Sequence, residues 1–143
     1  MKYLYEDITA KIWPAFRKLR TRFTYLRGLS ENEKRNALMN ELKDMGLSVC
    51  KEVPVIIREN GRRVGVGRMD LVVECRVVIE IKDQPYLKAE DTDQLDLYLK
   101  SSGLSIGVLL NFGAEEVDLN DPNQSKKVFI RRYIPDNDPT LKG

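Results

Sequence analysis

The sequence contains no histidine and only two cysteines in 143 residues. Without histidine the chain cannot form a Ser-His-Asp triad, a Cys-His pair or a common zinc hydrolase site, and histidine-dependent nucleases are excluded as well. The two cysteines, Cys50 and Cys75, supply neither a disulfide framework nor a four-ligand metal site, and we interpret them as ordinary thiols. Any catalysis must therefore depend on carboxylates, lysines, tyrosines and bound metal.

Long hydrophobic runs are missing too. The longest, such as residues 77–79 and 108–110, are far too short to cross a bilayer. The first five residues lead directly into two acidic ones, which is unlike a signal peptide. Apolar residues make up 42% of the chain and charged residues 32%, a balance typical of a soluble globular protein. We therefore expect a cytoplasmic protein with no membrane partner.

The length is sufficient for one hydrophobic core and too short for two ordinary domains. No repeat, low-complexity segment or linker divides the middle of the chain. We predict a single domain over residues 1–135, followed by a flexible tail over residues 136–143.

Two helices are predicted near the start of the chain. Apolar residues recur at helical spacing over residues 6–19, and Pro14 should kink or interrupt this helix. A second helix should begin at Ser30, because Ser30 and Glu33 match a capping box, and should end at Gly46.

The period then changes to that of strands. The predicted strands are residues 52–58, 69–73, 77–82, 106–111 and 127–133, with one further helix over 89–102. Asp91 or Thr92 lies near the start of that helix, and Gly103 follows its end. Asn60-Gly61 predicts a hairpin turn. This order indicates a mixed sheet with helices packed on it, an α/β or α+β domain.

Three charged side chains interrupt two apolar strands. Asp70 opens one strand, and Glu80 and Lys82 lie two residues apart in the next, so they project from one face. If a three-residue turn joins the strands so that Val73 pairs with Val77, the ladder places the two carboxylates opposite each other. Cross-strand neighbours have Cβ atoms about 4.5–5.5 Å apart, close enough for both carboxylates to hold one cation.

This group suits metal-assisted phosphodiester hydrolysis. Two carboxylates can bind Mg²⁺ or Mn²⁺ and leave coordination positions for water and phosphate oxygens. The Ile81 carbonyl is a further candidate ligand, and Lys82 is placed to orient the attacking water or to neutralise negative charge. The alternative is a solvated strand face on which Glu80 and Lys82 form an ordinary ion pair.

The same residues resemble a known family signature. Asp70 with Glu-Ile-Lys at 80–82 resembles the motif of the PD-(D/E)XK nucleases, and Gln-x-x-x-Tyr at 94–98 resembles the helix motif of their RecB-like branch. The closest similarity is to the small GxxExxY proteins of this superfamily. It covers about residues 5–117 and includes Gly-Val-Leu-Leu-Asn-Phe-Gly at 107–113.

The resemblance implies a restriction-endonuclease-like core, with a mixed central sheet flanked by helices, and a Mg²⁺-dependent nuclease that hydrolyses DNA in repair, recombination or defence. It implies that Gln94 and Tyr98, on one helical face, contact metal-bound water or DNA, and that Glu31 is a further metal ligand or holds water. Lys34 and Arg35 stand where the family pattern has tyrosine and usually an acidic residue. These differences leave open a nuclease-derived module that binds nucleic acid or regulates without cutting. A purely structural or partner-binding domain is a third alternative.

Basic residues are the candidates for contact with the DNA backbone. The net charge is only +2, but five basic residues crowd positions 17–27 together with two aromatics, which suits a phosphate backbone. The candidate nucleic-acid-binding residues are Arg22, Arg27, Lys34 and Arg68. Arg68 is equally compatible with an ion pair to Glu80. RNA is not excluded as a substrate, and a homodimer is an open alternative.

Overall fold

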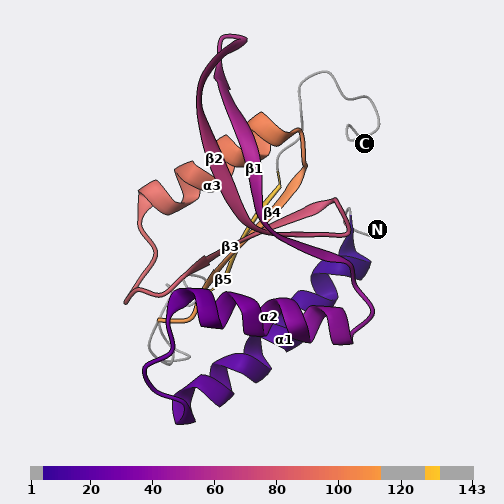
Figure 1. The fold of residues 1–143 in the computed structure, drawn as a ribbon, viewed down its shortest axis with the longest axis vertical. Coiled ribbons are helices and arrows are strands. Elements are labelled where there is room, and N and C mark those ends of the chain that lie inside the picture. Colours follow the sequence, from indigo (N-terminus) through magenta and orange to yellow (C-terminus); the bar gives the residue numbers. More distant parts are fainter. Residues whose placement is uncertain (1–4, 114–127, 133–143) are drawn as a thin grey trace.

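The structure is a computed structural model that describes residues 5–113 and 128–132 (Figure 1). Its elements in chain order are α1 (Glu6–Tyr25), α2 (Glu31–Asp44), β1 (Val49–Glu59), β2 (Arg62–Val73), β3 (Val77–Lys82), α3 (Ala89–Ser102), β4 (Ile106–Asn111) and β5 (Val128–Arg132). This is the predicted order, and the predicted fold class is confirmed: an α+β domain in which helices flank a mixed sheet, consistent with a restriction-endonuclease-like fold.

The strands form one sheet in the order β1-β2-β3-β4-β5. Neighbouring strands are antiparallel except β3 and β4, which run parallel. A parallel pair needs a crossover connection, and α3 supplies it. The C-terminal end of β3, where Glu80 and Lys82 lie, is therefore the end from which the chain enters α3.

The helices cover the two faces of the sheet in separate layers. Buried residues of α1 and α2 form one core with the sheet, which we call the α1–α2 core, and buried residues of α3 form the α3 core on the other face. Because strand side chains alternate, Ile79 and Ile81 of β3 contact the α1–α2 core and Val78 contacts the α3 core. Glu80 shares the face of Val78, which is the face that α3 covers.

The hairpin of β1 and β2 changes layer partway along its length. Val49 and Leu71 belong to the α1–α2 core, whereas Val55 and Met69 belong to the α3 core. On each strand the two residues are an even number of positions apart, so on a flat strand they would face the same way. The ribbon therefore rotates between them, around Asp70, and its far end projects beyond the rest of the sheet (Figure 1).

The predicted turns are present. Asn60 and Gly61 both have positive φ, 51° and 77°, as a two-residue hairpin turn requires. Val73 pairs with Val77 across the turn at residues 74–76, as predicted. The strands predicted at 52–58 and 69–73 are shorter than β1 and β2. The polar and glycine-containing residues near the turn also pair with each other, as far as Glu59 and Arg62.

The predicted helix over residues 89–102 is confirmed, whereas the first helix extends to Tyr25, beyond the predicted residue 19. Pro14 does not interrupt α1, since the helix continues through it; the buried residues around it hold the helix together against a proline cost of roughly 3 kcal/mol. α3 begins after Lys88, whose amide donates to the Asp91 carboxylate at 2.8 Å. The capping box of Ser30 and Glu33 is confirmed.

Some predictions lie outside the described residues. These are the ends of the last strand at Lys127 and Tyr133, the domain boundary at residue 135 and the tail over residues 136–143. Within the described part of the chain, none of the helices combines the length and the apolar character needed to cross a membrane.

Candidate functional site

Asp70 lies where the sheet ladder is interrupted on both sides. Towards β1 the pairing passes from Leu71 to Met69 without Asp70, and the facing residue, Glu52, has a left-handed backbone with φ 53°. Towards β3 the regular pairing ends at Leu71 and Ile79. The backbone groups around Asp70 are therefore free to bond to side chains instead of to a neighbouring strand.

The carboxylates of Asp70 and Glu80 fill this gap. The Asp70 amide donates to Glu80 Oε2 at 3.3 Å, and the Ile81 amide donates to Asp70 Oδ2 at 2.8 Å. The two strands are thus joined by reciprocal bonds from backbone to side chain, which hold both carboxylates against each other. Asp70 and Glu80 therefore contact each other, as the predicted pairing of Val73 with Val77 implied.

Glu80 is an unusual carboxyl group, because its side chain is only 3% exposed. Burial, and then the hydrogen bond and negative charge of Asp70, raise the pKa of Glu80 to about 10. Its Oε1 atom is buried and has no hydrogen-bond partner. At neutral pH the pair therefore keeps one proton that a cation could replace, and it offers that cation an oxygen with no other partner.

These features fit a divalent cation. Mg²⁺ is commonly held by one or two carboxylates and keeps several waters, so Asp70 and Glu80 are a sufficient protein contribution. Among the residues that the structure describes, no three acidic or thiol side chains gather closely enough to form a complete metal cage. The Ile81 amide contacts Asp70, whereas the ligand predicted at this residue was its carbonyl.

Glu31 approaches the pair from α2. It is the first residue of that helix, and the capping box of Ser30 and Glu33 fixes the helix start. Partial burial, and then the negative charge of Asp70, raise the pKa of Glu31, while the positive charge of Lys82 lowers it. The charge of Glu31 is thus coupled to the site, although it does not complete a group of three ligands.

Lys82 connects the carboxylates to α3. Its Nζ donates to Gln94 Oε1 at 3.0 Å and lies 3.9 Å from Asp91 Oδ1. Gln94 in turn donates to the Tyr98 hydroxyl at 3.3 Å. Tyr98 is buried against Gly67, where a Cβ would lie 2.5 Å from the tyrosine ring. One line of contacts therefore runs from Lys82 through Gln94 and Tyr98 to the hairpin.

Lys34 and Arg35 of α2 both have partners within the protein. Lys34 Nζ lies 2.7 Å from Asp83 Oδ2, next to the end of β3. Arg35 is buried and its Nη1 lies 3.1 Å from Glu52 Oε1, the residue that faces Asp70. These basic residues therefore fasten α2 to both strands that flank the candidate site.

The other candidate nucleic-acid-binding residues lie in different places. Arg22 lies 3.7 Å from Glu41 on α2, so its charge is partly neutralised. Arg27 is exposed in the loop between α1 and α2. Arg68 is exposed on β2 and, among the described residues, forms no ion pair with Glu80. Contact between Arg68 and nucleic acid stays a prediction.

Sequence reasoning missed the residues that fix the loop after β3. Asn111 is fully buried at the end of β4; its side chain accepts from the Gln84 amide at 3.1 Å and donates to the Gln84 carbonyl at 2.8 Å. The Gln84 side chain donates to Asp91. A polar residue that ends an apolar strand, here Asn111 after residues 108–110, was the signal for this role.

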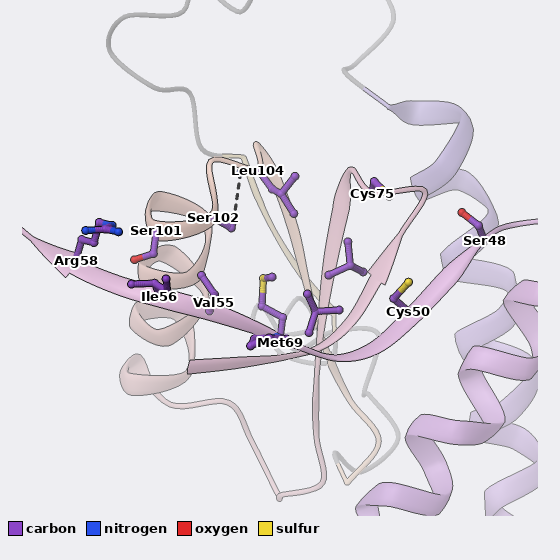
Figure 2. Close-up of a pocket in the computed structure, with 13 residues that line it drawn as sticks. Ser48, Cys50, Val55, Ile56, Arg58, Met69, Cys75, Ser101, Ser102 and Leu104 are labelled. Carbon is purple, nitrogen blue, oxygen red and sulfur yellow. Dashed lines mark hydrogen bonds between the residues drawn. The ribbon is translucent and has the colours of Figure 1, made fainter. Parts of the chain in front are cut away.

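A cavity of about 570 Å³ lies beside β1, away from these residues (Figure 2). It extends from Ser48 and Cys50 to Arg58 and the C-terminal end of α3, and its lining is mainly apolar. Neither Asp70 nor Glu80 lines it. The candidate chemistry of this protein is thus concentrated at the interrupted ladder rather than in this cavity.

Comparisons with known proteins identify the family of this chain. The family model of the PD-(D/E)XK nuclease superfamily matches residues 6–121. The match covers most of the chain, and the protein belongs to the PD-(D/E)XK nuclease superfamily. The crystal structure of SSO0001 is similar to this chain at 16% sequence identity and a TM-score of 0.42, covering 90% of this chain and 67% of that one. A search of curated proteins found no match.

Proposed function

We propose that the protein is a metal-dependent nuclease that hydrolyses DNA phosphodiester bonds at the site of Asp70, Glu80 and Lys82. The observation that carries this proposal is the meeting of the two carboxylates at the interrupted ladder, with one buried oxygen of Glu80 left without a partner. Membership of a nuclease superfamily supports it. The resemblance to GxxExxY proteins and to the RecB-like branch suggests repair, recombination or defence in the cytoplasm.

The two carboxylates are the residues that would hold Mg²⁺ or Mn²⁺, with Glu31 and the Ile81 carbonyl as further candidate ligands. When bound, the ion supplies a Lewis acid for the phosphate and a water of lowered pKa. Glu80 must lose its proton for the ion to bind. Burial and the negative charge of Asp70 oppose that loss, and the positive charge of a bound ion would offset both effects.

Lys82 is the cationic group of the site. Its ammonium contacts Gln94 and Asp91 of α3, its positive charge acts on Glu80, and it can donate to a phosphate oxygen or to the attacking water. Gln94 holds Lys82 at 3.0 Å and is itself bonded to Tyr98. Gln94 and Tyr98 are therefore proposed as positioning residues for Lys82, and their contact with metal-bound water or DNA stays a prediction.

Substitution of the three residues tests the proposal. Asp70→Asn, Glu80→Gln and Lys82→Ala should each reduce Mg²⁺-dependent cleavage of duplex DNA by about 10²- to 10³-fold, since each removes charge from the reacting centre. Cleavage is followed on gels with linear duplex, four-way junction and duplex RNA, and size-exclusion chromatography records whether the active form is a homodimer.

Asp93→Asn is the matched control, because Asp93 is an exposed carboxylate of α3 outside these contacts. It should cleave as the wild type does, and circular dichroism should show all four variants folded. If the three site variants cleave at the rate of this control, the proposed active site is wrong.

A second candidate is a module that binds nucleic acid without cutting it. The observation in its favour is that no third acidic ligand completes the site among the described residues. Such a module would bind DNA but give no Mg²⁺-dependent cleavage under any condition, and its affinity would be unchanged in Asp70→Asn.

A further inference from the structure

We infer that the far end of the β1–β2 hairpin is a DNA-binding arm, which grips the backbone of a B-form duplex about 8 base pairs from the position of cleavage. The arm is defined as residues 54–68. This inference rests on the proposed function, and it names a surface that the nuclease site itself does not include.

The arm carries a net positive charge. Its fifteen residues contain four arginines and one glutamate, a net charge of +3, whereas the whole chain has only +2. The rest of the molecule is therefore slightly negative. The arginines are Arg58, Arg62, Arg63 and Arg68.

These arginines do not serve the fold. All four are exposed, and no ion pair or side-chain hydrogen bond joins any of them to another described residue. Arg58 and Arg63 are cross-strand partners, an arrangement in which like charges destabilise a sheet. By contrast, the arginine-rich helix α1 places Lys18 and Arg22 against Glu41. The arm thus keeps its charges available for an external anion.

The shape of the arm fits a duplex. A two-stranded ribbon is narrow enough to enter the major groove of B-DNA, and the hairpin projects beyond the sheet (Figure 1). The face turned away from α3 holds the exposed pair Ile56 and Val66, which are 41% and 58% exposed, with Arg68 on the same face. In the major groove, thymine methyl groups lie between the two phosphate backbones. The aliphatic side chains of the arm could contact those methyl groups, and the arginines beside them could contact the phosphates.

The distance along the ribbon sets the position of contact. Arg62 is eight residues from Asp70 on the same strand, which at about 3.3 Å per residue is roughly 26 Å. DNA rises about 3.4 Å per base pair, so the tip reaches about 8 base pairs from a phosphate at Asp70. DNA that ends closer than this to the cleavage position would not reach the tip.

The test compares wild type with Arg62→Gln/Arg63→Gln. Binding of a fluorescent 30-base-pair duplex is measured by anisotropy in EDTA over a range of salt concentrations. The variant should bind about tenfold more weakly, and the slope of log K against log salt should fall by about 2, because each substitution removes one phosphate-binding arginine. Lys11→Gln/Lys43→Gln, which removes two exposed charges from α1 and α2, should behave as wild type.

Three further readouts complete the test. Wild type should bind the 30-base-pair duplex more tightly than an 8-base-pair duplex, and the arm variant should show little of this preference. The Tm of the variant should be equal to or above that of wild type, since repulsion with Arg58 is removed. A preference of wild type for duplex RNA over duplex DNA of equal length would contradict the B-form assignment.

The outcomes separate this inference from the proposed function. If wild type binds and cleaves DNA but the arm variant keeps its affinity and salt slope, the arm assignment is wrong and the nuclease proposal stands. If wild type binds no duplex even at low salt, both are wrong.

Discussion

At the scale of single residues, Glu80 is the side chain on which the proposed function depends. A buried carboxyl beside a second carboxyl is costly when ionised; the positive charge of Lys82 offsets only part of this cost, and Glu80 Oε1 has no hydrogen-bond partner among the described residues. Such a residue weakens the fold at neutral pH, so its presence is explained by what it binds rather than by stability.

The cost of Glu80 should appear as a pH dependence of stability. The pKa of Glu80 is raised from 4.5 to about 10, so between these values the folded protein holds a proton that the unfolded chain has released. Its contribution to stability is complete below about pH 4.5 and is lost as the pH rises towards 10. Glu80→Gln removes this loss.

In EDTA, the Tm of Glu80→Gln minus that of wild type should therefore be small at pH 5 and increase by several degrees or more by pH 9. Calorimetry at four pH values measures it. Parallel curves for the two proteins would show that Glu80 ionises normally and is not coupled to Asp70.

The alternation of residues predicted much of this site. Polar residues at 80 and 82 within an apolar strand, and the short turn before it, were sufficient to place Asp70 beside Glu80. The partners of Lys34 and Arg35 could not be predicted, because Asp83 and Glu52 come close to α2 only through packing of the whole domain.

At the scale of elements, the contact between β2 and α3 connects the hairpin to the site. Gly67 is required there by the Tyr98 ring, since a methyl group would lie 2.5 Å from it. Moving that ring would disturb Gln94 and, through it, Lys82. The spacing of Gln94 and Tyr98 predicted that they share a face, but it gave no indication of the glycine opposite them.

Gly67→Ala should destabilise the protein by about 1–3 kcal/mol by overpacking and should reduce cleavage as well. In a Tyr98→Ala background the same substitution should cost much less, because the ring is absent. Denaturant unfolding of the four proteins gives the coupling energy. Additive effects would show that Gly67 and Tyr98 do not touch.

The length of the hairpin was the feature that the sequence predicted least well. Over residues 59–68 Val64 and Val66 are the apolar side chains, and the glycines and arginines around them are not typical of a strand, so only residues 52–58 and 69–73 of the hairpin were predicted as strands. The rotation around Asp70 was not predictable either, because it depends on two cores competing for one ribbon.

At the scale of the whole molecule, the candidate metal site and the tip of the proposed DNA-binding arm lie at different ends of the hairpin. The two carboxylates lie at the base of the hairpin, close to α2 and α3, while Arg58, Arg62 and Arg63 of the arm lie towards its tip. The overall order of elements was readable from sequence because each helix and strand has a strong local pattern. The distribution of uncompensated charge could not be predicted from the sequence, because the packing of the helices decides which arginines have an acidic partner.

The central claim is that Asp70 and Glu80 jointly bind one divalent cation. Isothermal titration of the folded protein with Mn²⁺ tests it most directly, with wild type, Asp70→Asn, Glu80→Gln and the control Asp93→Asn. We predict one ion per chain for wild type and Asp93→Asn, with proton release from Glu80, and at least tenfold weaker binding in both site variants. Equal Mn²⁺ affinity in all four proteins, or no binding to wild type, would contradict it.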